Sequence, residues 1–143
     1  MQAPGPDWGW VAVGLGPGSP QATAFAATVN VGHERFAQVG AHWTTASDLF
    51  NAGAGRSAVH VGGGLTRVDR WSRLAVAAGP AWVWDRDAEL AGRSGAGAVV
   101  SGQATLTPLP EPGIGLGLDA YAFASRVGAG YGVAVTLVFE RNR

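Results

Sequence analysis

Hydrophobic residues alternate with small or polar residues along most of this chain. The alternation has a period of two and recurs in segments of roughly ten residues separated by turn-like stretches. Helices are disfavoured because glycine recurs in these segments, and each glycine inside a helix costs about 1 kcal/mol relative to alanine. The pattern predicts strands at residues 8–16, 22–34, 35–46, 57–68, 72–85, 95–107, 113–125 and 129–140. We therefore expect one all-β domain over residues 1–143, an eight-stranded antiparallel up-and-down β-barrel.

The predicted strands have two chemically different faces. One face carries bulky apolar side chains such as Val13, Val29, Val39, Val61, Val76, Val100, Leu118 and Val135. The other face is small or polar, with Thr28, Asn30, Gly40, Ser101, Thr105 and Thr136 among its residues. A soluble barrel would bury the bulky face and solvate the other with charges, whereas a membrane barrel turns the bulky face to lipid and fills a narrow lumen with small polar groups. Because the second face has few charges, the pattern favours a transmembrane β-barrel.

Composition supports the same interpretation. Charged residues make up 14% of the chain, compared with roughly 25% in an average soluble domain. Ten basic residues balance ten acidic ones, so there is no basic field to attract nucleic acid, and we predict no nucleic-acid partner. The chain has no cysteine, which excludes a disulfide framework and a thiolate metal site.

Connections and aromatic residues differ between the two ends of the predicted barrel. The longest links, 46–57 and 86–94, fall at the same end, and outer-membrane barrels have longer loops on one side than on the other. Aromatic rings lie toward both ends: Trp43, Trp82, Trp84 and Tyr131 toward the long-loop end, and Trp71 and Phe139 toward the short-turn end. We predict that these six rings form girdles at the two membrane interfaces. Trp10 falls on the inner face, where we expect it to plug the lumen.

The last predicted strand carries a resemblance to a known family. Residues 130–139, Gly-Tyr-Gly-Val-Ala-Val-Thr-Leu-Val-Phe, resemble the C-terminal signal of outer-membrane barrels, a glycine followed by alternating apolar residues and a final aromatic. Residues 140–143 extend past that aromatic. The whole chain is similar to small eight-stranded barrels of the OmpA/OmpX type. The resemblance implies location in a bacterial outer membrane, contact with its lipid, both termini in the periplasm, and recognition of the last strand by the insertion machinery.

The inner face contains a candidate polar site. A hairpin centred near residue 51 would place His42 directly opposite His60. The polar network that we predict in the lumen comprises His42, His60, Asp119, Tyr121, Gln38 and Gln103. Two imidazoles in contact suggest a metal or pH-responsive site, whereas the alternative is a hydrogen-bonded plug of side chains. Because two histidines lack a defined third ligand, we favour the plug and predict no metal and no cofactor.

Charged residues form a second inner cluster near the short-turn end. Glu34, Arg73 and Glu140 all fall on the inner face by parity. Opposite charges held in a closed lumen would pair and stiffen the floor of the barrel. We therefore predict a structural role for this cluster.

No motif indicates catalysis. The glycine-rich stretches 62–64 and 113–117 are not followed by the Lys-Ser/Thr of a phosphate-binding loop, and no nucleophile elbow is present. We predict a non-enzymatic outer-membrane barrel with a structural, adhesion or surface-interaction role, whose extracellular partner the sequence does not identify. The alternative is a soluble lipocalin-like barrel that carries a small ligand. The two hypotheses differ at Val133, Val135 and Leu137, which face lipid in the first and are buried in the second.

Overall fold

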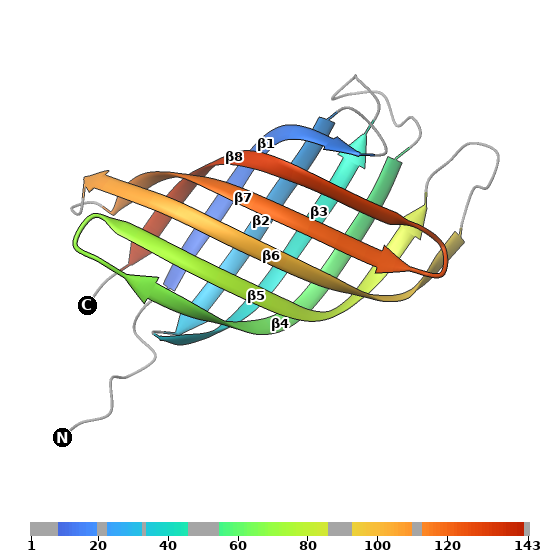
Figure 1. Ribbon diagram of the computed structural model, residues 1–143, viewed down its shortest axis with the longest axis horizontal. Coiled ribbons are helices and arrows are strands. Elements are labelled where there is room, and N and C mark those ends of the chain that lie inside the picture. Colours follow the sequence, from blue (N-terminus) through green and yellow to red (C-terminus); the bar gives the residue numbers. More distant parts are fainter. Residues whose placement is uncertain are drawn as a thin grey trace.

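The chain forms a closed barrel of eight antiparallel strands (Figure 1). The computed structural model describes residues 9–19, 23–32, 34–45, 55–85, 93–109 and 113–141. The strands are β1 (Gly9–Ser19), β2 (Thr23–Gly32), β3 (Arg35–Thr45), β4 (Gly55–Val68), β5 (Ser72–Asp85), β6 (Arg93–Leu109), β7 (Ile114–Ser125) and β8 (Ala129–Arg141). Each strand pairs with the next along the chain, and β1 pairs with β8 to close the sheet. The predicted fold class is confirmed.

The strands lie close to the segments that periodicity predicts, with two informative extensions. β4 begins at Gly55 and β6 begins at Arg93, so each takes residues that the sequence analysis assigned to the links 46–57 and 86–94. The ladder continues there because Arg56 pairs with Asp85, and Asp85 pairs with Arg93. The remaining parts of the two links, 46–54 and 86–92, lie outside the described residues.

The outer surface of the barrel is apolar. Val133 is 42% exposed, Val135 59% and Leu137 52%, and Leu106 and Tyr131 are more exposed still. The residues between them on β8, including Ala134 and Thr136, are buried in the lumen. The bulky face therefore points outward, which contradicts the soluble alternative that required these residues to be buried.

The two ends of the barrel are defined by strand register. Gly9 pairs with Arg141, so the start of β1 and the end of β8 lie at the same end, together with the β2–β3, β4–β5 and β6–β7 connections. We call this the floor, and the opposite end the mouth. Two glycines at the floor, Gly32 and Gly113, have φ values of +142° and +80°, which residues other than glycine rarely adopt. No described residue belongs to a helix long and apolar enough to cross a membrane.

Candidate functional site

The lumen is filled by side chains in successive layers. Two separate apolar clusters lie inside the described barrel, one around Trp10 and Phe36 near the floor and one around Val83, Val99 and Phe123 near the mouth. A polar network lies between the two clusters, and an ion pair lies beyond each of them. Because inward residues come from every strand, each layer is assembled from positions far apart in sequence.

Gln38 is one centre of the polar network. Its amide nitrogen donates to the side-chain oxygen of Asn30 at 2.8 Å, and its amide oxygen lies 2.8 Å from Nε2 of His60. The hydroxyl of Ser101 donates to the same amide oxygen at 3.3 Å. Gln38, Asn30 and His60 are each at most 2% exposed, so these bonds replace hydration inside the lumen.

Gln103 is the second centre and joins the network to the floor. Its amide oxygen accepts a hydrogen bond from the indole Nε1 of Trp10 at 3.0 Å. Its amide nitrogen donates to Thr28 at 3.0 Å and to a carboxylate oxygen of Asp119 at 3.2 Å. The side chain of Asn30 donates to Thr28 and to the backbone oxygen of Trp10, which connects the two centres.

His42 lies between the second histidine, an acid and a tyrosine. Its Nε2 is 3.6 Å from Asp119 Oδ2, and its ring stacks on His60 with centroids 5.1 Å apart. The ring of Tyr121 lies 4.1 Å away on a tilted plane, and the Tyr121 hydroxyl donates to the backbone oxygen of Trp43 at 3.2 Å. Within the described part of the chain, neither nitrogen of His42 has a hydrogen-bond partner, and Nδ1 of His60 has none.

The expected pairing of the two histidines was wrong in its register. His42 lies opposite Ala58, and His60 lies opposite Gly40, so the rings meet on a diagonal rather than face to face across the ladder. The hairpin is centred at residue 50, midway between 42 and 58, and not at residue 51. A shift of this size moves the opposed pair by two positions while leaving both side chains on the inner face.

Glycine makes room for the rings. A Cβ added at Gly40 would lie 2.6 Å from Cε1 of His60, and a Cβ added at Gly132 would lie 3.0 Å from the Tyr121 hydroxyl. A lumen of eight strands is just wide enough for its own side chains. The small residues opposite the rings are therefore part of the packing of the site.

The floor holds a buried ion pair. Nη1 of Arg73 lies 2.8 Å from Oε1 of Glu140, and Thr107 donates to the same carboxylate oxygen at 3.1 Å. The guanidinium also lies over the ring of Trp10, 4.1 Å from its centroid. The side chains of Arg73 and Glu140 are only 2% and 7% exposed, so the pair is shielded from solvent.

Glu34 does not belong to this cluster, contrary to the sequence prediction. It is exposed and lies in the turn between β2 and β3. Strand parity ends at Gly32, whose positive φ reverses the chain, so extending the alternation to residue 34 assigned the side chain to the wrong face. The backbone oxygen of Glu34 accepts a hydrogen bond from Thr66 N at 2.9 Å.

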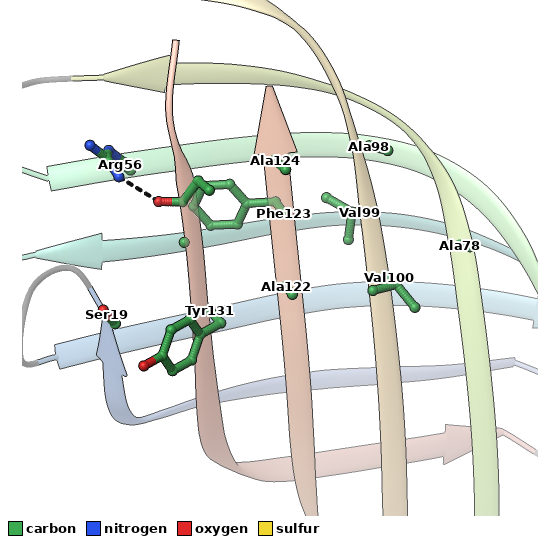
Figure 2. Close-up of a pocket in the computed structure, with 12 residues that line it drawn as sticks. Ser19, Arg56, Ala78, Ala98, Val99, Val100, Ala122, Phe123, Ala124 and Tyr131 are labelled. Atoms are coloured by element: carbon green, nitrogen blue, oxygen red, sulfur yellow. Dashed lines mark hydrogen bonds between the residues drawn. The ribbon is translucent and has the colours of Figure 1, made fainter. Parts of the chain in front are cut away.

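The mouth holds a second ion pair that the sequence analysis missed. Nε of Arg56 lies 3.4 Å from Oδ2 of Asp85, and its Nη1 donates to the backbone oxygen of Ala129 at 2.6 Å. Ala129 belongs to β8, so Arg56 reaches from β4 toward another wall of the barrel (Figure 2). Centring the β4–β5 hairpin on residues 70–71 would have paired Arg56 with Asp85 from sequence alone.

The aromatic residues predicted at the interfaces lie on the outer surface. Trp71, Trp82, Trp84, Tyr131 and Phe139 are exposed, and Trp43 is half-buried because it stacks on Phe25 with ring centroids 5.2 Å apart. Trp10 is the exception that parity predicts, with 2% exposure inside the lumen.

The geometry of the lumen suits a plug better than a ligand site. No three His, Asp or Glu side chains in the described ranges are arranged to hold a metal ion. The stacked imidazoles present ring faces to each other, so their nitrogens do not converge on one point. The apolar layer of Val83, Val99 and Phe123 separates the polar network from the mouth.

Comparison with known proteins identifies the fold and nothing finer. No protein-family model and no curated protein matches the chain. A structure from the de novo design of transmembrane β-barrels matches with a TM-score of 0.60 and 15% identity, over 98% of this chain and 99% of that one. Ail, the attachment invasion locus protein of Yersinia pestis, matches with a TM-score of 0.60 and 9% identity, over 95% of this chain and 99% of that one. The barrel thus has the architecture of transmembrane eight-stranded barrels, including one of the OmpX-like type that the sequence resembles.

Proposed function

We propose that this protein is a bacterial outer-membrane β-barrel with a structural or adhesion role, and that its lumen is a packed plug. The observation that carries the proposal is the apolar outer surface, on which valine, leucine and aromatic side chains are 37–64% exposed. Such a surface is unsuited to water over so much of a small protein, and it matches the lipid-facing band of a membrane barrel. A closed ladder without strand edges is the form of β-sheet that lipid tolerates.

The adhesion role rests on likeness to Ail, which is named as an attachment protein. The start of β1 and the end of β8 share the floor, and in this proposal the floor, with both termini, faces the periplasm. The mouth then faces outward, where the links 46–57 and 86–94 would contact an extracellular partner. The insertion machinery would engage β8, whose last outward apolar side chain is the exposed ring of Phe139.

Folding with and without detergent tests the membrane location. We expect a compact β form that unfolds on boiling, shown by heat-modifiable gel migration and β-type circular dichroism, in micelles but not in plain buffer. A monodisperse β protein in detergent-free buffer would contradict the proposal.

Two further measurements separate the plug and the adhesion role. In planar bilayers the folded barrel should produce no stepwise conductance, because the apolar layers interrupt the polar network. A non-adherent bacterium that displays the barrel should gain binding to host cells or matrix, compared with the same strain displaying an unrelated barrel. Stable conductance steps would exclude the plug. Unchanged adherence would exclude the adhesion role, and only the structural role would remain.

A further inference from the structure

The outer wall formed by β6 and β7 is lined by small side chains. The outward pairs across these strands are Ala98 with Ala124, Val100 with Ala122, Gly102 with Ala120, and Ala104 with Leu118. Each pair contains an alanine or a glycine, and a Cβ added at Gly102 would meet no atom within 4 Å. On β3 and β4 the run of small outward residues is interrupted by Val39 paired with Val61, which lies between the pairs Ala37 with Gly63 and Ala41 with Val59.

Two depressions follow this wall along the strands. The larger, of about 610 Å³, is lined by Ala78, Ala98, Val100, Ala122, Ala124 and Tyr131, among others. Figure 2 shows Ala78, Val100, Ala122 and Tyr131 in one row across four neighbouring strands. The smaller, of about 310 Å³, surrounds Ala104 between Leu74, Leu106, Leu116, Leu118 and Val135. Gly102 and Ala120 lie between the two depressions in the register, and we call the whole feature the alanine trough.

One end of the alanine trough carries two described arginines. Ser19, Arg56 and Ala129 line the larger depression at the mouth, where the hydrogen bond from Arg56 to the Ala129 oxygen holds the guanidinium (Figure 2). The Arg56 side chain is 28% exposed. The exposed Arg126 follows Ala124 by two residues. The described exposed charges beside this depression are the guanidinium groups of Arg56 and Arg126, whereas the carboxylate of Asp85 is buried. The other end is lined mainly by leucines, and the one arginine that borders it, Arg73, is buried in its ion pair with Glu140.

We propose that the alanine trough binds one acyl chain of an anionic lipid, whose phosphate meets Arg56 and Arg126 at the mouth. The proposal rests on the membrane location argued above. A concave apolar channel inside a lipid-facing surface is filled by hydrocarbon chains, and a cationic group at one end sets the direction in which a lipid lies. From Ala124 to Leu118 the trough extends roughly 20 Å along β7, since a strand rises about 3.4 Å per residue.

Native mass spectrometry of the micelle-folded barrel tests the site. The probes are dimyristoyl phosphatidylglycerol, which is anionic, and dimyristoyl phosphatidylcholine, which is zwitterionic. We expect one phosphatidylglycerol retained per barrel. Ala122→Leu should weaken retention of both lipids about tenfold, because it fills the site that the chain occupies. Arg126→Gln should weaken retention of phosphatidylglycerol about fivefold and should leave retention of phosphatidylcholine unchanged. Ala37→Leu is the matched control, because Ala37 is an exposed outward alanine on β3, away from the trough.

Heat-modifiable gel migration before lipid addition separates failure of this site from failure of the membrane location. If the wild-type barrel folds only in detergent but Ala122→Leu and Ala37→Leu retain lipid equally, the site is wrong and the membrane location stands. If Ala122→Leu instead abolishes a dimer seen with the wild type, the occupant is a second copy and the lipid proposal is overturned. If Arg126→Gln leaves the preference for phosphatidylglycerol unchanged, the assignment of the phosphate to the mouth is overturned.

Discussion

The two ends of the lumen are closed by the same chemistry in different environments. At the floor, Arg73 and Glu140 lie 2.8 Å apart and are almost fully buried. At the mouth, Arg56 and Asp85 lie 3.4 Å apart, and the arginine is 28% exposed. The floor pair also packs on the ring of Trp10, whereas the mouth pair is completed by a backbone oxygen of β8.

The contribution of an arginine–carboxylate pair to stability depends on how far the pair is buried. A buried pair is costly to break because the remaining charge is left without water or partner, whereas an exposed pair contributes little since water replaces the lost contact. The floor should therefore behave as a rigid base and the mouth as an adjustable rim. Four predictions test this contrast, ordered by expected effect.

Arg73→Met should have the largest effect. It leaves the buried carboxylate of Glu140 without its cation and removes the guanidinium from Trp10, so the free energy of unfolding should fall by about 3–5 kcal/mol. Urea unfolding in micelles, followed by tryptophan fluorescence, measures this change. The double variant Arg73→Met/Glu140→Met should recover part of the loss, because no unpaired charge then remains. A loss below about 1 kcal/mol for the single variant would remove the distinction between the two ends.

Gln103→Leu should have the next largest effect. This variant tests whether the rigid floor extends into the polar network. The change leaves the indole nitrogen of Trp10 and a carboxylate oxygen of Asp119 without this partner in the lumen, and we expect a loss of about 2–3 kcal/mol. Ser101→Ala is the comparison, since that hydroxyl makes one long bond of 3.3 Å to Gln38. Equal losses for the two variants, measured by the same unfolding assay, would contradict a network centred on Gln103.

Gly40→Ala and Gly102→Ala form a matched pair that contrasts the inside of the barrel with its outside. The added methyl group at Gly40 would lie 2.6 Å from the His60 ring, and the resulting strain should cost about 1–3 kcal/mol. At Gly102 the same methyl group points into open space, so stability should change by less than about 0.5 kcal/mol. Thermal unfolding in micelles checks both. If the two substitutions cost the same, close packing of the lumen around the histidines is refuted.

Arg56→Met should have the smallest effect on stability among the charge variants. Because the pair is partly exposed, the free energy of unfolding should fall by less than about 1 kcal/mol. The contribution of the pair in the wild type should decrease as salt screens it. Urea unfolding at low and high ionic strength measures both quantities. A loss as large as that of Arg73→Met would mean that the mouth is as rigid as the floor.

The strands of this protein and their two faces could be predicted from the alternation in the sequence. A period of two assigns every residue of a strand to one of two sides, so the outward valines and the inward Gln38, Gln103 and Asp119 followed from parity alone. The small number of charges on the second face then favoured a membrane barrel over a soluble one. The prediction failed at Glu34, where a glycine of positive φ ends the alternation that parity needs.

Which inward residues contact one another depends on the closed barrel and could not be predicted from the alternation. Trp10 bonds Gln103, 93 residues away, and Arg56 reaches Ala129, because closure of the sheet sets the stagger between strands on different walls. Even the neighbouring histidines depended on a register that the link 46–57 does not specify, and they meet on the diagonal. Alternation acts within a strand, whereas contacts across a lumen depend on how all eight strands close together, and no local pattern contains that information.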